Sequence, residues 1–224
     1  MARLCFDYGH GGNDPGATYK GRKEAEEVLN IGKKVAAEVR RFGVIVDETR
    51  TSDKAVTLKE RSNYENKSNY DYFISFHRNA FKPEQARGVE TFIYLNPGAR
   101  AEAMAEKIQK ALVAVGFSNR GVKRENFHVL RETVAPAILV EMGFLDNSKD
   151  NQIFDSKKRQ IIEALASAIL QQLGIKYTQE QSKPTVNTLY RVMVGSYANR
   201  ENAEKQIQRL KEAGFDAVVM IGEK

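Results

Sequence analysis

Short apolar runs alternate with longer amphipathic segments over most of the chain. Runs at 2–7, 43–49, 71–77, 88–94 and 137–144 have the length and composition of β-strands. Segments at 24–42, at about 100–115 and at about 156–173 repeat apolar residues every three or four positions, which is typical of helices packed on one side. Such alternation predicts an α/β fold with a mostly parallel, twisted sheet flanked by helices.

The pattern changes after residue 174. Residues 175–188 are polar, show no periodicity and contain Pro184, so they predict a linker. Residues 189–224 read as a strand, a helix capped by Asn199, and a second strand after Gly214, which is one small β-α-β unit. We therefore expect a main domain at 1–174, a linker at 175–188 and a small C-terminal unit at 189–224.

Composition narrows the class of partner. The net charge of +6 and the pI near 9.3 favour an acidic partner such as nucleic acid, an anionic membrane or an anionic wall polymer. No basic helix interleaved with aromatic residues occurs, so we expect no nucleic-acid binding.

No segment approaches the ~18 apolar residues of a membrane span. The N-terminus lacks the apolar core of a signal peptide, so we expect synthesis in the cytoplasm without one.

Two of the three histidines, His10 and His77, end predicted strands. Because the carboxyl ends of parallel strands gather functional groups, we expect the two imidazoles to converge. A catalytic zinc takes about three protein ligands from His and carboxylate side chains and keeps one position for water. The pair therefore predicts one catalytic Zn²⁺ with an acidic third ligand near His10.

Three glutamates at the start of the first long helix, Glu24, Glu26 and Glu27, are candidates for that ligand. Acids in the first turn of a helix are also favoured by its dipole alone. Glu26 lies one turn before Asn30 on the same flank, and a polar Asn in an apolar stripe suits a partner that orients a ligand. We prefer Glu26, with Glu24 as the alternative.

Glu141 lies within the apolar run PAILVEMGF. A buried, unpaired carboxylate costs several kcal/mol, so Glu141 is expected to meet a cation or to transfer protons. A structural ion pair is the alternative to a catalytic role. Beside a metal site such a carboxylate acts as a general base.

These residues lie in motifs that resemble the zinc-dependent N-acetylmuramoyl-L-alanine amidases. The matching segments are FDYGHGGNDPGA, EEVLN, ISFHRNA, FHVLRET and PAILVEMGFLDN, and the resemblance covers about residues 2–173. It implies that His10, Glu26 and His77 bind zinc and that Glu141 is the catalytic acid and base. We also expect Asn79 to contact substrate, and His128 to contact substrate or to support the site. Arg78 departs from the family, which often has a small residue there, and is expected either to contact an acidic part of the peptide or to face solvent.

The implied reaction is hydrolysis of the amide bond between N-acetylmuramic acid and L-alanine in bacterial peptidoglycan, by an autolysin or a phage endolysin. A zinc peptidase acting within the stem peptide and a non-catalytic wall-binding protein are the alternatives. Without a signal peptide, such an enzyme is expected to reach the wall after lysis or holin-type release.

The tail resembles one half of a sporulation-related (SPOR) domain, which implies binding to glycan strands. A unit of about 36 residues rarely buries enough apolar surface to be stable alone. We therefore expect it to pair with its copy in a homodimer or to dock on the catalytic domain.

Overall fold

The computed structural model describes residues 1–179 and 194–219. The chain divides into two compact units, Met1–Gln179 and Glu180–Lys224. The expected linker lies mostly outside the described residues, so its C-terminal limit stays a prediction.

A six-stranded sheet with the order β4-β1-β5-β8-β6-β7 forms the centre of the first unit. Its strands are β1 (Arg3–Tyr8), β4 (Ile45–Glu48), β5 (Tyr72–Asn79), β6 (Val89–Ile93), β7 (Asn119–Arg124) and β8 (Ala137–Phe144), while β2 (Thr18–Tyr19) and β3 (Arg22–Lys23) form a separate short hairpin. Within the sheet β6 runs antiparallel to β8, and the other neighbours are parallel. The expected mostly parallel α/β fold is confirmed.

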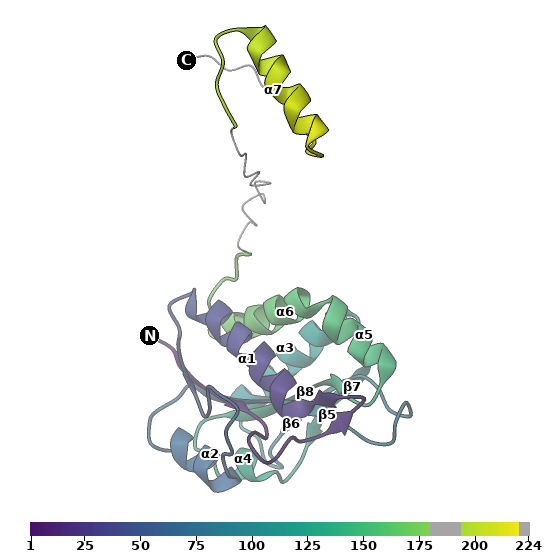
Figure 1. Cartoon of the computed structure of the whole chain (residues 1–224). Helices are drawn as coiled ribbons and strands as arrows, with labels where there is room; N and C mark the ends of the chain where they lie inside the picture. Colours follow the sequence, from purple (N-terminus) through teal and green to yellow (C-terminus); the bar gives the residue numbers. More distant parts are fainter. Residues whose placement is uncertain (180–193, 220–224) are drawn as a thin grey trace. The chain divides into compact units, whose positions relative to one another are not determined.

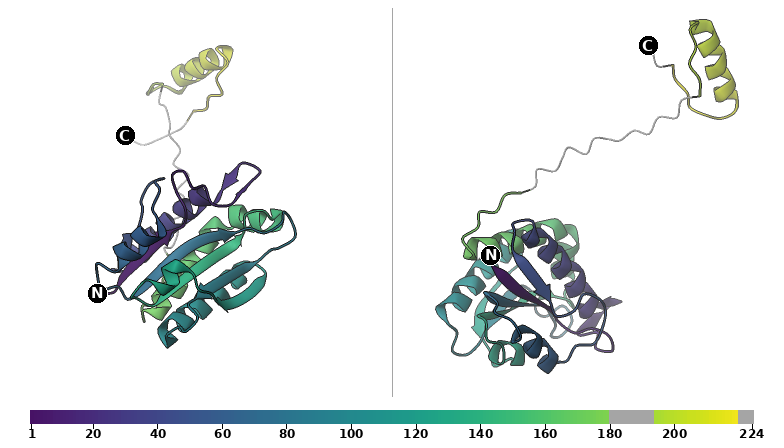
Figure 2. Two further views of the ribbon diagram at one scale, coloured as in Figure 1. Left: turned by 90° about the horizontal axis from the view of Figure 1, so that it is seen from below. Right: turned by 90° about the vertical axis from the view of Figure 1, so that its left-hand side faces the viewer.

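Helices cover the two faces of this sheet unequally (Figure 1). One face carries α1 (Glu24–Arg40), α3 (Ala99–Val115), α5 (Ser148–Ser156) and α6 (Lys158–Gln172), and the other carries the shorter α2 (Leu58–Glu65) and α4 (His128–Arg131). The first view in Figure 2 shows strands of this second face between the short helices. The second face is therefore covered by fewer and shorter helices than the first.

Side chains on the second face change from apolar to polar along the strands. At one end Cys5, Phe73, Leu139 and Phe92 pack with α4 in a small apolar cluster. Because alternate residues of a strand share a face, that face continues with polar residues, namely Asp7 on β1, Ser75 and His77 on β5, Glu141 on β8 and Glu90 on β6. The first face is mostly apolar and forms the main core with α1, α3 and α6.

The first unit extends beyond its expected end at residue 174. Ile175 and Tyr177 pack against the main core, and the Tyr177 hydroxyl donates to Glu38 Oε1 at 2.9 Å. The Tyr177 ring also lies 5.4 Å from that of Phe42. Residues 175–179, assigned to the linker from their polar composition, therefore belong to the first unit, because two apolar side chains anchor them.

The described part of the second unit contains α7 (Arg200–Glu212), whose cap Asn199 accepts from the Glu201 amide at 2.9 Å. The helix and its cap agree with the sequence. The expected strands on either side reach into 180–193 and 220–224, outside the described residues.

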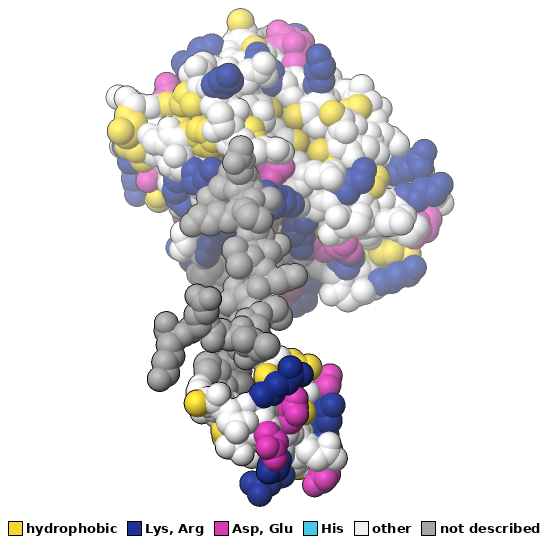
Figure 3. Space-filling view, turned by 90° about the horizontal axis from the view of Figure 1, so that it is seen from above, with side chains coloured by type: hydrophobic (Ala, Val, Ile, Leu, Met, Phe, Trp, Pro, Cys, Tyr) yellow, Lys and Arg dark blue, Asp and Glu magenta, His cyan; other side chains and the backbone are white. Residues whose placement is uncertain are grey.

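Basic and acidic side chains are interspersed on the face shown in Figure 3, rather than gathered into one basic patch. Among the described helices, none combines the length and apolar character needed to cross a membrane.

Candidate metal centre

His10, Glu24 and His77 form one cluster. His10 Nε2 lies 3.1 Å from Glu24 Oε2, and His77 Nδ1 lies 2.9 Å from Glu24 Oε1. The two imidazole rings are 5.2 Å apart and nearly perpendicular. One donor atom from each side chain lies within 4.8 Å of the other two. The strand ends therefore bring the histidines together as expected, with the Glu24 carboxylate between them.

The backbone around the cluster holds Glu24 in place. Glu24 is the first residue of α1, and its carboxylate accepts from the Ala17 and Arg78 amides, each at 3.0 Å. A Cβ added at Gly16 would lie 2.7 Å from Glu24 Oε2, and one added at Gly9 would lie 2.1 Å from His77 Cε1. These glycines therefore permit an approach that larger residues would block.

The Glu24 carboxylate and the two imidazoles shift one another's pKa values. Burial alone would raise the pKa of Glu24, but the hydrogen bonds and charges of His10 and His77 hold that pKa below its usual range. Burial lowers the pKa of His10, but Glu24 and Asp14 outweigh it and raise the pKa to about 9. The pKa of His77 is raised against burial in the same way, chiefly by Glu24.

Two imidazole nitrogens and one carboxylate are the donor set that a catalytic zinc takes in many hydrolases. His10 Nδ1 is held by Asp14 Oδ2 at 2.8 Å, which leaves Nε2 facing the cluster. A carboxylate on the second ring nitrogen is the usual orienting partner of a metal-binding histidine. The residues present therefore fit Zn²⁺. The sequence alone gave Asp14 no role, although its place four residues after His10 in the glycine-rich loop was the available signal.

Glu141 lies next to the cluster on the neighbouring strand. It pairs with His77 in the register of β5 and β8, so the two side chains share a face. Its Oε2 atom is buried and has no hydrogen-bond partner among the described residues. Burial raises the pKa of Glu141 to about 8; the positive charge of His77 opposes this shift, and the negative charges of Glu24 and Glu90 add to it. An unpaired carboxyl group with such a pKa suits proton transfer.

The family model for N-acetylmuramoyl-L-alanine amidase matches residues 4–171, most of the chain and all of the residues of this site. The chain belongs to the N-acetylmuramoyl-L-alanine amidase family. It is 34% identical over 225 residues to the sporulation-specific N-acetylmuramoyl-L-alanine amidase of Bacillus subtilis (strain 168), a match that covers 99% of this chain and 85% of that protein.

Two further similarities extend this result. The endolysin of Bacillus phage SPP1 is 34% identical over 194 residues, covering 82% of this chain and 71% of that protein. The crystal structure of N-acetylmuramoyl-L-alanine amidase from Clostridium difficile 630 matches with a TM-score of 0.74 and 34% identity, over 77% of this chain and 97% of that one.

A SPOR domain model matches residues 152–221 of this amidase. The match overlaps the amidase match over 152–171, a stretch that lies in α5 and α6 and packs in the first unit. The resemblance of the tail to a SPOR domain is therefore confirmed, and residues 180–221 of the match belong to the second unit.

Glu26 does not lie in the cluster. Glu26 is exposed and pairs with Lys23 at 2.9 Å, and Asn30, expected to orient it, is exposed as well. Glu26 lies two residues after Glu24, and two residues turn a helix by about 200°, so the two carboxylates point to different sides. The expected position of Glu26 beside the histidines is therefore wrong, and Glu24, which was the alternative, lies there instead.

Arg78 is buried and does not face the cluster. Its guanidinium contacts Glu27, donates to Asn151 Oδ1 at 2.8 Å and stacks over Phe154 at 4.0 Å. The side chain therefore joins β5 to α1 and α5, and the expected contact with substrate does not fit its burial.

Asn79 and His128 occupy different surroundings. Asn79 Nδ2 donates to Glu90 Oε1, one strand beyond Glu141. His128 is half-buried at the start of α4, and its Nε2 lies 3.2 Å from Ser62 Oγ of α2. Asn79 is thus close to the site, whereas the hydrogen bond of the His128 ring joins the helix pair α2 and α4. Their contact with substrate stays a prediction.

A buried ion pair supports the loop that carries His10. Arg61 of α2 donates to Asp7 at 2.6 Å and to the His10 carbonyl at 2.7 Å. Asp7 also accepts from Thr49 at 2.6 Å and from Ser75 at 2.7 Å. The pair therefore fixes the end of β1 against β4, β5 and α2.

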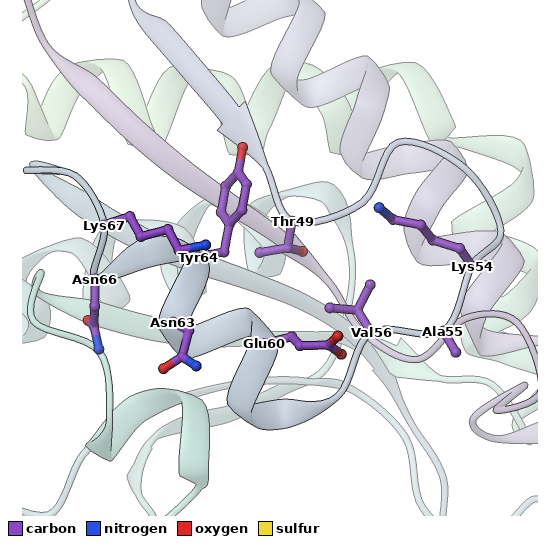
Figure 4. A pocket seen from close by; sticks show the side chains of 9 residues that line it. All are labelled: Thr49, Lys54, Ala55, Val56, Glu60, Asn63, Tyr64, Asn66 and Lys67. Atoms are coloured by element: carbon purple, nitrogen blue, oxygen red, sulfur yellow. The ribbon is translucent and has the colours of Figure 1, made fainter.

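A surface pocket of about 540 Å³ lies beside α2 (Figure 4). It is lined by Thr49, Lys54, Ala55, Val56, Glu60, Asn63, Tyr64, Asn66 and Lys67. The residues of the cluster and Glu141 are absent from this lining, so the candidate metal centre lies outside this pocket.

Proposed function

We propose that this amidase is zinc-dependent, with His10, Glu24 and His77 as the metal ligands and Glu141 as the catalytic acid and base. Its reaction is hydrolysis of the amide bond between the lactyl group of N-acetylmuramic acid and L-alanine in peptidoglycan. The observation that carries the proposal is the Glu24 carboxylate held between two imidazoles, with the unpaired Glu141 carboxyl group one strand away.

When bound, zinc supplies a positive charge that polarises a carbonyl oxygen, makes water more acidic and favours the ionised form of nearby carboxylates. Glu141 accepts a proton from the attacking water as the new C–O bond forms. It then returns that proton to the L-alanine nitrogen as the C–N bond breaks. The products are a lactyl carboxylate on the glycan and a stem peptide with a free L-alanine amino group.

The C-terminal unit is proposed to bind glycan strands of the wall, which the SPOR match supports. The expected homodimer through this unit stays a prediction of the sequence. The similar proteins include a sporulation-specific enzyme and a phage endolysin, so the amidase is proposed to act on a bacterial wall in one of these two settings.

Digestion of purified peptidoglycan tests the proposed reaction. We expect new L-alanine amino groups with intact glycan strands, loss of release on chelation and recovery with Zn²⁺. New amino groups on other stem residues would instead indicate a peptidase. Binding to the wall without any release would indicate a non-catalytic wall protein.

A further inference from the structure

Glu90, Arg120 and Lys123 form a second charged group beside the catalytic glutamate, on β6 and β7. Glu90 Oε2 accepts from Arg120 Nε at 2.9 Å and also contacts Lys123 Nζ. The other oxygen of Glu90 accepts from Asn79. The proposed reaction uses none of these side chains.

The register of the sheet places this group next to the reacting centre. Glu90 pairs with Glu141 across the antiparallel strands β6 and β8, and Glu141 pairs with His77 across β8 and β5. Directly opposed residues in an antiparallel pair have Cβ atoms about 4.5–5.5 Å apart. Arg120 and Lys123 thus reach a carboxylate that is the immediate neighbour of Glu141.

The charges of the group do not cancel. Glu90 is buried, whereas the side chains of Arg120 and Lys123 are 34% and 40% exposed. Two cations share one carboxylate, which leaves one positive charge facing solvent. Burying Glu90 fixes both cations, and a fixed pair of cations binds an anion with less loss of side-chain entropy than a free pair.

Arg120 is held in a geometry that suits a carboxylate. Its guanidinium lies over the Phe144 ring at 4.9 Å. Within the described residues it donates a hydrogen bond through Nε alone, so both terminal nitrogens are available. Terminal guanidinium nitrogens bind a carboxylate in bidentate fashion.

We propose that Arg120 and Lys123 form a subsite for a carboxylate of the stem peptide, on the residue that follows L-alanine. This inference rests on the proposed function. The charged ends of Arg120 and Lys123 contact Glu90 on β6, which is one strand from Glu141 on β8. Neighbouring strands lie about 4.8 Å apart and one extended residue spans about 3.5 Å, so these charged groups lie within one or two residues of an amide bond beside Glu141. The residue after L-alanine is a glutamate joined through its side chain, and it presents a free α-carboxylate or, in amidated walls, a carboxamide.

If this subsite exists, the amidase distinguishes walls with the free α-carboxylate from walls with the carboxamide. Charge-assisted hydrogen bonds are about twice as strong as neutral ones. The carboxylate form should therefore have a kcat/KM at least about tenfold higher than the carboxamide form, with the difference mainly in KM.

The experiment uses two soluble N-acetylmuramoyl tripeptides that differ only in this carboxylate or carboxamide, with the full chain. In Lys123→Gln and Arg120→Gln the preference should fall to within about twofold, because the charge-assisted bonds are lost. Arg124→Gln is the matched control, because Arg124 also lies on β7 but is exposed and pairs with Glu102 at 3.2 Å. It should keep the wild-type preference.

Three results would overturn the subsite, and they separate it from the proposed function. Equal kcat/KM on both substrates in the wild type refutes the subsite while the amidase function stands. Variants that lose activity on both substrates together, at an unchanged preference, show that the cations only stabilise the fold around Glu90. A wild type that releases no L-alanine amino group from either substrate refutes the proposed function itself.

Discussion

The position at which α1 begins determines which of its carboxylates faces the sheet. Lys23, the residue before the helix, is extended, and the short β2–β3 hairpin delivers the chain to Glu24. The Glu24 side chain then turns inward to the two histidines, whereas Glu26 turns outward to Lys23. A shift of the helix start by two residues would exchange their positions.

Glu24→Gln is expected to lower zinc affinity by at least about 100-fold. Replacing a residue that only hydrogen-bonds to a metal ligand already lowers metal affinity by about 10–100-fold, and Glu24 is proposed to bind the metal itself. Glu26→Gln is the matched control and should retain a full equivalent of zinc. Metal content per chain after dialysis measures both. Loss of zinc from Glu26→Gln with retention in Glu24→Gln would return the ligand role to Glu26.

Strand positions allowed His10, His77 and Glu141 to be chosen from the sequence, because each follows or interrupts an apolar run at a recognisable place. Glu24 could not be separated from Glu26 in this way. The distinction depends on the hairpin with the preceding Ala17 amide and on the Arg78 amide, which come from two distant parts of the chain.

At the scale of elements, β1, β5 and β8 were predictable because they are continuous apolar runs. The edge strand β7 was missed, since its sequence NRGVKR is polar and half-exposed. The antiparallel direction of β6 could not be predicted from the sequence either, because it depends on the path of the chain between the strands. The charged group on β6 and β7 therefore became visible only in the fold.

The Asp7–Arg61 pair joins β1 to α2, and its contribution should depend on pH. Burial alone would raise the pKa of Asp7, but Arg61 and the hydroxyls of Thr49 and Ser75 hold that pKa below its usual range. A carboxyl group with a lowered folded pKa stabilises the fold above its unfolded pKa, and this stability is lost as the pH falls through the folded pKa.

Asp7→Asn is therefore expected to lower the free energy of unfolding by about 3–5 kcal/mol at pH 7, because it leaves Arg61 buried without its charge partner. The difference from the wild type should shrink as the pH falls below the unfolded Asp value of 3.8. Urea unfolding of both proteins at several pH values measures it. A difference that stays constant down to strong acid would contradict the assigned role.

At the scale of the whole molecule, the candidate site lies in the first unit, whereas the SPOR match runs from the end of that unit into the second. The cluster, Glu141 and the charged group all lie within Met1–Gln179. A chain ending at residue 179 should therefore bind zinc and hydrolyse soluble muramoyl peptides at the rate of the full chain.

The same truncation should reduce the fraction that co-sediments with insoluble wall, because it removes the proposed glycan-binding unit. The full chain serves as the control in both assays. Undiminished co-sedimentation would assign wall binding to the first unit, whereas loss of hydrolysis of soluble peptides would show that the second unit contributes to catalysis.

The most direct test of the central claim is the rate at which Glu141→Gln releases L-alanine amino groups from purified peptidoglycan while it carries a full equivalent of zinc. Proton transfer by a positioned side chain contributes about 10²–10⁴-fold to rate, so we expect a loss in this range with zinc binding unchanged. A zinc-loaded Glu141→Gln that works within a few-fold of the wild-type rate would contradict the account.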